Sequence, residues 1–430
     1  MVDSMSQKKI HWIKKLTILI TILISSLSLI FLVIYFIARN DITVKYGSNY
    51  QLHTFSLSDY TFYFRVHTKR KTTFIAAWSI EKWKLMELEE VLPEIDKFSS
   101  LTDLDLSNTG NIKLSKEIKQ LTSLTKLDLS NTRWTGLPKE IEQLTSLTEL
   151  NLSNCRLTRL PKEIEQLTSL TKLNLSHNHL RFPLEGISKL TSLTELDFSH
   201  NSGFNYEKQI KFPPSLVKLD LSYNLLGGIP KEITSLSSLK KLNLSHNSLA
   251  FFPIDSDDDL FFELRTAKLE GVPYIGMLSS LVELDLSFNN LGYLPQEFAQ
   301  LSSLKKLNLS SNRLEAFPIN ISDLSVFTDG TFERHYHLSK IGLDTQLEKL
   351  FSLTELDLSS NKLKYLTKEI GKLSSLKRLT LSNNKLSRFP KELGKIPSLT
   401  RLDLSGNTID KTQLEQIKSW LPNCTVCLSK

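Results

Sequence analysis

A nine-residue motif that recurs at a fixed interval limits the possible folds of this chain more than any other feature. The motif reads Leu-x-x-Leu-x-Leu-Ser-x-Asn in most copies, and most copies begin 23 residues after the preceding one. Such self-similarity indicates a solenoid, in which each repeat packs only against its neighbours. The 430 residues therefore do not imply several globular domains. The twelve copies begin at Leu101, Leu124, Leu147, Leu170, Leu193, Leu216, Leu239, Leu281, Leu304, Leu353, Leu376 and Leu399.

Each copy predicts a short strand, because its fourth and sixth positions are apolar and alternate with polar residues. Identical strands in consecutive repeats pair in parallel, and parallel pairing requires a return segment between them. In that segment Ile164 and Leu167 are spaced as the inward face of a helical turn. A single repeat buries too few side chains to offset the loss of chain entropy, so the repeats must stack. Prolines that suit a return leg without regular strand structure are Pro138, Pro161, Pro230, Pro295 and Pro390.

The motif resembles the signature of the leucine-rich-repeat family, L-x-x-L-x-L-x-x-N/C-x-L. The second half of each repeat, such as LPKEIEQLTSL at residues 160–170, is similar to the variety seen in bacterial and intracellular members. The resemblance covers about 330 residues. It implies an α/β leucine-rich-repeat solenoid, a horseshoe with a parallel sheet on its concave face. The family binds many unrelated partners, so the resemblance favours binding over catalysis without naming a partner.

Residues 16–38 form an uncharged apolar stretch that predicts one N-terminal transmembrane helix. As a helix its 23 residues span about 34 Å, enough for a hydrocarbon core of roughly 30 Å. Lys8, Lys9, Lys14 and Lys15 precede it, so the positive-inside rule places the N-terminus in the cytoplasm and the repeats across the membrane. A cleaved signal peptide is the alternative, although its apolar region would be shorter.

The remaining boundaries follow from the repeat. Residues 1–15 form a short basic cytoplasmic tail, 39–100 a linker and N-terminal cap, 101–410 the solenoid and 411–430 a C-terminal cap. Residues 62–66 and 74–78 predict a hairpin that covers the first repeat, and residues 414–421 predict a capping helix before a last edge strand. Longer spacings place insertions near 254–279 and 325–350, both expected on the return side.

The ninth position of the motif is predicted to turn inward and to serve the backbone. An asparagine amide there can bond unpaired groups of both neighbouring turns, which gives an internal ladder. Asparagine fills this position in all but the first three copies, where the residues are Thr109, Thr132 and Cys155. We therefore interpret these asparagines as structural.

The third, fifth and seventh positions are expected on the open concave face. The third position alternates in charge over most of the array, which predicts opposite-charge pairs between neighbouring strands and a locally neutral surface. The chain carries a net charge of only +7. Both observations argue against a nucleic-acid partner, which requires net positive potential and stacking aromatic residues. The candidate concave-face residues at the third position are Glu195, Lys218, Lys241 and Glu283.

The eighth position lies where each strand ends, and five consecutive copies carry a large ring there. In the outer copies it is Asn, Ser or Gly. Large amphipathic side chains in contiguous repeats are typical of interface anchors, so we predict a partner-binding rim. The alternative is repeat drift with rings that pack on one another. The rim residues are His177, His200, Tyr223, His246 and Phe288.

No constellation of Ser, His and Asp or of Cys and His is evident, so we expect no enzyme and no cofactor. Some bacterial proteins with similar repeats carry a ubiquitin-ligase domain after the array, but only about 20 capping residues follow the repeats here. Metal binding is not expected either, because each candidate group falls short of a full ligand set. These groups are the aspartates near Asp257, the pair His335 and His337, and the pair Cys424 and Cys427.

The sequence therefore predicts a membrane-anchored, non-catalytic protein that recognises another protein, or a glycan, through its repeat surface. A structural or adhesive role, through self-association or surface glycan binding, is the alternative.

Overall fold

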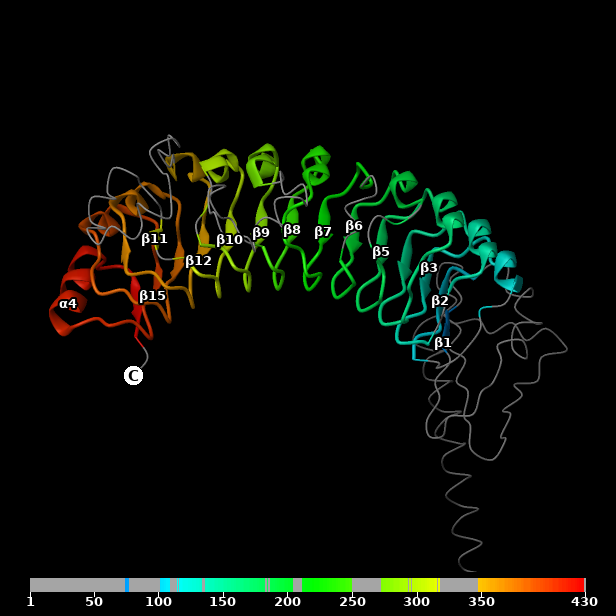
Figure 1. The fold of residues 1–430 in the computed structure, drawn as a ribbon, viewed down its shortest axis with the longest axis horizontal. Helices are drawn as coiled ribbons and strands as arrows, with labels where there is room; N and C mark the ends of the chain where they lie inside the picture. Colours follow the sequence, from blue (N-terminus) through cyan, green and yellow to red (C-terminus); the bar gives the residue numbers. More distant parts are fainter. Residues whose placement is uncertain are drawn as a thin grey trace, which may run out of the picture.

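The repeats form one continuous stack in the computed structural model. It describes residues 74–76 and 101–428, apart from 109–113, 115, 134–135, 182–183, 185, 204–210, 250–271, 293, 295, 315 and 318–346. Figure 1 shows an arch with short helical turns along its outer side and α4 (Lys411–Trp420) at one end. The expectation of a solenoid with a parallel sheet is confirmed.

Fourteen of the described strands form one sheet in which every pairing is parallel and the order follows the sequence. Neighbouring strands pair in the same register throughout, so that Leu196 lies opposite Leu219 and Leu219 opposite Leu242. The strands are β1 (Phe74–Ala76), β2 (Asp103–Asp105), β3 (Lys126–Asp128), β4 (Glu149–Asn151), β5 (Lys172–Asn174), β6 (Glu195–Asp197), β7 (Lys218–Asp220), β8 (Lys241–Asn243), β9 (Glu283–Asp285), β10 (Lys306–Asn308), β12 (Glu355–Asp357), β14 (Arg378–Thr380), β15 (Arg401–Asp403) and β16 (Thr425–Cys427).

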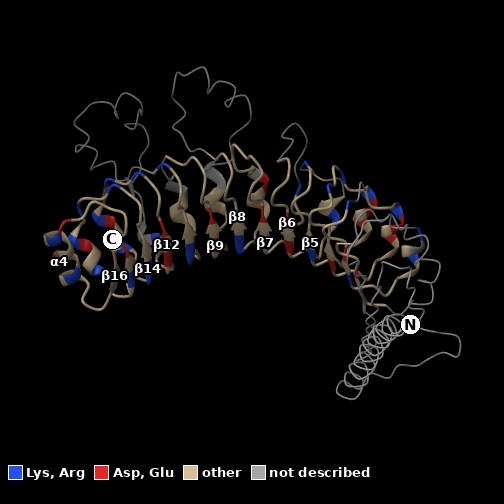
Figure 2. Cartoon of the chain, turned by 90° about the horizontal axis from the view of Figure 1, so that it is seen from below, with Lys and Arg blue, Asp and Glu red and all other residues tan. Residues whose placement is uncertain are grey.

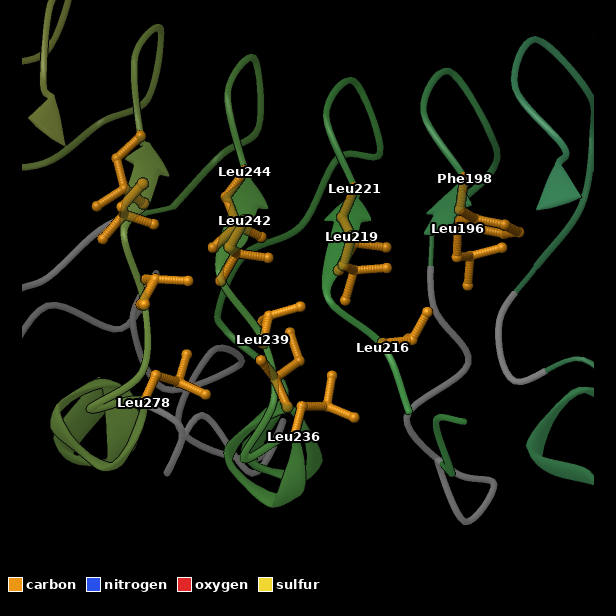
Figure 3. Packing of buried hydrophobic residues seen from close by; sticks show 14 of the residues in the cluster. Leu196, Phe198, Leu216, Leu219, Leu221, Leu236, Leu239, Leu242, Leu244 and Leu278 are labelled. Atoms are coloured by element: carbon orange, nitrogen blue, oxygen red, sulfur yellow. The ribbon is translucent and has the colours of Figure 1, made fainter. Parts of the chain in front are cut away.

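The core is a set of leucine rows that run along the stack. In each repeat the central strand residue is buried while its two neighbours remain accessible, as in β6 and β7. Leu216, Leu239 and Leu281, which begin three successive copies, are 0% exposed. Figure 3 shows Leu196, Leu219 and Leu242 pointing to the same side of their strands. Each row joins equivalent residues of adjacent coils, so a repeat gains its buried surface from its neighbours.

The return segments contain the helical turns that the spacing of Ile164 and Leu167 predicts, and these are 3-10 helices. Proline stands immediately before several of them, with backbone angles that are extended, as at Pro161. The turns are η3 (Lys116–Gln120), η4 (Lys139–Gln143), η5 (Lys162–Gln166), η6 (Ile187–Lys189), η7 (Lys231–Ser235), η8 (Val272–Met277), η9 (Gln296–Gln300), η12 (Leu347–Leu350), η13 (Lys368–Lys372) and η14 (Lys391–Lys395). A two-stranded sheet, β11 (Ala316–Phe317) with β13 (Tyr365–Leu366), joins two return segments.

The asparagine ladder is confirmed in atomic detail. Nδ2 of Asn178 donates to the carbonyls of Leu152 at 2.8 Å and Leu175 at 2.9 Å. Its Oδ1 accepts from the backbone N–H groups of Cys155 at 3.1 Å and Leu157 at 2.9 Å. One side chain thus satisfies backbone groups of two successive turns, which is the role expected for the ninth position.

In the copies that carry Thr132 and Cys155 at the ninth position, smaller side chains bond buried backbone groups. The hydroxyl of Thr132 donates to the carbonyl of Leu129 at 2.6 Å, and the thiol of Cys155 lies 3.1 Å from that carbonyl. Burial raises the pKa of the Cys155 thiol, and Asp128 adds to that effect, whereas hydrogen bonds from Thr132 oppose it. Cys155 is therefore a structural residue in its neutral form.

The ends of the array carry capping elements. At the C-terminus, Asp410 caps α4 by accepting a hydrogen bond from the N–H of Gln413, and β16 adds to β15 in parallel. The helix and edge strand expected there are present. At the other end β1 pairs with β2 in parallel. The remainder of the expected hairpin lies outside the described residues.

Two further expectations lie wholly or partly outside the described residues. The predicted transmembrane segment, residues 16–38, is one of them; within the described residues no helix combines the length and apolarity that a bilayer crossing requires. The bodies of both insertions also lie outside. Their last residues, however, form η8 and η12, which pack against the neighbouring turns η9 and η13 as ordinary parts of the return leg.

Candidate binding surface

The third-position charges form cross-strand ion pairs on the face of the sheet, as expected. Nζ of Lys241 lies 3.0 Å from a carboxylate oxygen of Glu283, and Glu149 lies between Lys126 and Lys172 at 3.4 and 3.7 Å. These side chains are about half exposed, so each pair stabilises the fold by about 1 kcal/mol or less. Viewed from below in Figure 2, basic and acidic residues mix along this face.

The alternation has interruptions that the register makes visible. In the register of the sheet, Lys218 lies opposite Glu195 on one side and opposite Lys241, which has the same charge, on the other. Arg378 and Arg401 are likewise direct neighbours. A groove of about 470 Å³ crosses the face from β7 to β14, and its lining includes Lys218, Lys241 and Glu283. Three of the four predicted concave-face residues therefore line one groove, and Glu195 lies beside it.

The seventh position contributes little exposed surface, which corrects the sequence-based expectation: its serines are buried from Ser176 to Ser287 and buried or only partly exposed in the outer copies. Ser199 and Ser222 are 7% and 5% exposed. The reason is local: the Ser222 hydroxyl donates to Oδ1 of Asp220 at 2.7 Å, and the backbone N–H of Ser222 bonds the same oxygen at 2.9 Å. The fifth-position side chain thus folds over the end of its own strand and covers the serine.

The eighth position has a left-handed backbone in every described repeat of the array. The φ angle is 55° at His177, 56° at Tyr223 and 53° at Phe288. Outer repeats place Asn or Ser there, and Gly406 has φ 67°. Asparagine, histidine and glycine tolerate this conformation, whereas tyrosine and phenylalanine are disfavoured there by about 1–2 kcal/mol. Tyr223 and Phe288 therefore occupy their positions against a backbone preference.

Successive coils hold these backbones in line. The N–H of Tyr223 donates to the carbonyl of Ser245 at 3.1 Å, and the N–H of His246 donates to that of Ser287 at 2.9 Å. Equivalent bonds fix His200 and Phe288. The position and direction of each ring are thus set by the stack rather than by a flexible loop.

The five rim residues form one continuous stack of rings, which we call the aromatic ladder. The ring centroids lie 4.0 Å apart for His177 and His200, 3.9 Å for His200 and Tyr223, 3.9 Å for Tyr223 and His246, and 4.0 Å for His246 and Phe288. Interplanar angles of 10–14° make each contact a near-parallel stack. The rings therefore pack on one another, as the alternative expectation states. Contact of these rings with a partner remains a prediction.

The ladder is packed on its ring faces yet accessible along its edge. Tyr223 is 42% exposed and Phe288 is 50% exposed. Leu225, two residues after Tyr223, is 80% exposed and also has a positive φ, at 55°. Sequence reasoning missed Leu225, because a leucine inside a leucine-rich motif is expected to be buried. Its exposure extends the apolar surface beyond the ladder.

The histidines of the ladder share an electrostatic environment. Burial lowers the pKa of His200, and the nearby His177 and His246 lower it further. Asp197 and Asp220 act in the opposite direction. The balance keeps His200 neutral at neutral pH, which suits a stacked ring.

The other candidate chemistries find no geometric support among the residues that the structure describes. No cluster of three or more His, Cys, Asp or Glu residues there could hold a metal ion. Cys424 and Cys427 are free thiols at the last strand, and burial raises the pKa of Cys424. The acidic insertion and the pair His335 and His337 lie outside the described residues.

Family profiles match most of the described array. A profile named leucine-rich repeat region matches residues 84–211, and one named leucine rich repeat matches 207–254, 274–314 and 351–409. A further profile of the same name covers 398–424. A comparison with curated proteins gives no match.

Solved structures show the same fold. A leucine-rich-repeat protein of Leptospira interrogans is 32% identical, with 79% of this chain and 87% of that one covered and a TM-score of 0.52. An internalin of Listeria monocytogenes is 21% identical, covering 78% and 82%, with a TM-score of 0.57. A plant peptide hormone receptor, solved in complex with RGF2, is 24% identical, covering 85% of this chain and 51% of that one, with a TM-score of 0.53.

Proposed function

Because this chain belongs to the leucine-rich-repeat family, we propose that it is a non-catalytic binding protein whose partner is another protein. The partner docks on the aromatic ladder and on the adjoining concave face near Glu195, Lys218, Lys241 and Glu283. The plant receptor solved with its ligand has the same fold at 24% identity. That likeness concerns the fold alone, so the proposal depends on the surface of this chain.

The observation that carries the proposal is the conflict between ring and backbone at the eighth position. Five contiguous repeats place large rings at this left-handed backbone, where flanking repeats use Asn, Ser and Gly; histidine tolerates the conformation, but it is unfavourable for Tyr223 and Phe288. Stacking returns about 0.5–1.5 kcal/mol per pair, which roughly offsets the strain and leaves little net gain in stability. Left-handed conformations of bulky residues cluster at functional sites. Tyrosine and other aromatic residues are also the typical anchors of protein interfaces.

Membrane anchoring belongs to the same proposal. Residues 16–38 are apolar and long enough to span a bilayer as one helix, and the lysines before them favour a cytoplasmic N-terminus. The repeats would then bind their partner on the non-cytoplasmic side. Protease accessibility of the repeats in intact cells tests this arrangement: protection until lysis would contradict it.

Photo-cross-linking tests the binding surface. A photoreactive phenylalanine analogue at Phe288 of the full-length protein should cross-link a partner that mass spectrometry identifies. The same analogue at Lys391, on the return side, should not. The identified partner, made recombinantly, should bind wild-type protein but lose at least tenfold in affinity for a Tyr223→Ser, Phe288→Ser variant.

Two outcomes contradict the proposal. Full affinity of the double variant would exclude the ladder as the docking surface. A cross-linked product with the mass of two copies of this chain, and no other, would favour the alternative function, self-association in a structural or adhesive role. Cross-links to glycan alone would favour glycan binding instead.

A further inference from the structure

A second row of side chains runs beside the ladder, at the tenth position of the motif. This position lies between the inward ninth and eleventh residues, so its side chain faces solvent; Arg156, His179, Arg313 and Lys362 are all exposed. No copy carries an acidic residue there. In order along the stack the row reads Gly110, Arg133, Arg156, His179, Ser202, Leu225, Ser248, Asn290, Arg313, Lys362, Lys385 and Thr408.

Charge is distributed along this row in three blocks. Arg133 and Arg156 lie toward the N-terminus, and Arg313, Lys362 and Lys385 toward the C-terminus. The block between them contains no Lys, Arg, Asp or Glu. The row differs in this respect from the concave face, where acidic and basic side chains pair across the strands.

Backbone hydrogen bonds hold the C-terminal block in line. The N–H of Arg313 donates to the carbonyl of Leu291, that of Lys362 to Leu314 and that of Lys385 to Leu363, each at 2.9 Å. The three cations therefore stand on consecutive coils in equivalent positions. Like charges at this spacing repel one another, so they gain from an anionic partner.

The tenth-position row and the aromatic ladder together form one edge of the stack. This edge is most apolar at the middle block. Leu225 is 80% exposed and lies two residues from Tyr223, the central ring of the ladder. Phe288, at the end of the ladder, is 50% exposed. An exposed apolar centre with charged flanks has the composition of a docking surface, in which the centre supplies affinity and the flanks supply orientation.

We infer that this edge docks an acidic protein segment, with apolar side chains at its middle and carboxylates toward both ends. This inference rests on the proposed function and adds the chemistry of the partner. Arg156 and Arg313 are separated by six strand spacings, which is roughly 29 Å at about 4.8 Å each. An extended segment rises about 3.3 Å per residue, so its two acidic ends lie roughly nine residues apart.

Defined peptides and the full-length protein test the inference. The probe is a peptide of about 16 residues, with a centre of about eight residues that contains Trp and Leu and with four glutamates at each end, so that the inner glutamates lie roughly nine positions apart. Binding is measured by fluorescence anisotropy at low and high salt. Wild-type protein should bind it, and a peptide with lysine ends should bind at least tenfold more weakly. Affinity should also fall as salt screens the flanking charges.

Matched variants test whether binding depends on the charges of this edge or on the total charge of the protein. Arg313→Glu, Lys362→Glu and Lys385→Glu together should weaken binding at least tenfold. Lys162→Glu, Lys368→Glu and Lys391→Glu change the same number of exposed charges on the return side, and they should alter affinity less than twofold. Circular dichroism checks that each variant is folded, and the corresponding Gln variants serve if charge reversal prevents folding.

Several results would overturn the inference. They are equal losses in the two triple variants, equal binding of the lysine-ended peptide, and no binding of the acidic peptide at about 1 mM. Equal binding of polyglutamate without an apolar centre, or of heparin, would reduce the edge to a general polyanion surface. If the ladder variant loses the natural partner while the Arg313 triple variant retains it, the proposed function stands and only this inference fails.

Discussion

Each ninth-position asparagine stabilises the repeat array through several hydrogen bonds of a single side chain. Asn178 bonds three carbonyls and two N–H groups that belong to two successive turns, and it is 4% exposed. Water cannot replace the amide at so buried a site. The residue is therefore a structural requirement of the coil, and its removal has a predictable cost.

Asn178→Ala should lower the free energy of unfolding by at least about 3 kcal/mol, because several buried polar groups lose their partners at about 1–3 kcal/mol each. Urea unfolding measures the loss, and hydrogen exchange should localise it to the amides of Cys155 and Leu157. Asn131→Ala, at an exposed eighth position, is the control and should cost less. Equal effects of the two substitutions would contradict the structural role.

The fold does not require rings at the rim positions, in contrast to the asparagines at the ninth position. Phe288→Asn removes one stacking contact with His246, worth about 0.5–1.5 kcal/mol. It also relieves a left-handed strain of about 1–2 kcal/mol. The free energy of unfolding should therefore change by less than about 1 kcal/mol, while partner binding is lost. A thermal unfolding curve checks the first part, and a large destabilisation would show that the ladder serves the fold.

At the scale of the element, the ladder joins five coils through the faces of their rings. Its histidines are close enough that protonation of one affects the next, and the acidic residues that face His200 are Asp197 and Asp220. Burial together with His177 and His246 outweighs those carboxylates, so the pKa of His200 lies below its ordinary value of 6.5. The ladder is therefore most stable when the His200 ring is neutral.

A pH dependence follows from that direction. As the pH falls below 6.5, the unfolded chain takes up a proton at His200 before the folded chain does, so stability decreases. Above that pH both states are neutral and the contribution is complete. His200→Gln should flatten the fall in unfolding midpoint between about pH 7 and pH 5. Identical pH profiles for the variant and the wild type would exclude His200 as the responsible group.

On the scale of the whole molecule, the core is a continuous set of leucine rows, in which each coil depends on the two beside it. Leu402 and Leu404 in the last regular repeat are 0% exposed. Their strand is paired with β16, and α4, whose Ile417 is buried, packs against the adjacent turn η14. An end that loses its cap exposes a leucine row that a globular protein would keep inside.

Removal of residues 411–430 should therefore lower protection from hydrogen exchange most strongly in β15 and progressively less toward β10, because coupling in a repeat array extends mainly to nearest neighbours. Ile417→Ala should produce a milder form of the same gradient, at a cost of about 2–5 kcal/mol. The exposed Glu415→Ala is the control. Uniform loss of protection along the whole array would show a more cooperative fold than nearest-neighbour stacking allows.

The sequence alone determined the coil. The 23-residue period, the leucines at Leu104 and Leu106 and their equivalents, and the asparagines at the ninth position each have one geometric solution, since a repeated buried pattern must meet its own copies. The third-position charge pairs followed from the same register. These features depend on local periodicity, which a sequence displays directly.

Only the tertiary structure decided what the turns present to solvent. The left-handed backbone at the eighth position and the exposure of Leu225 depend on how each turn is bonded to the next. The burial of Ser199 and Ser222 depends on a hydrogen bond to the aspartate two residues before each of them. The stacking of His177 to Phe288 and the alignment of Arg313 with Lys385 arise because residues 23 or more positions apart in the chain are brought to the spacing of adjacent strands. The sequence pattern identifies the coils. The distances between the coils, and therefore the surface that they form, are set by their stacking.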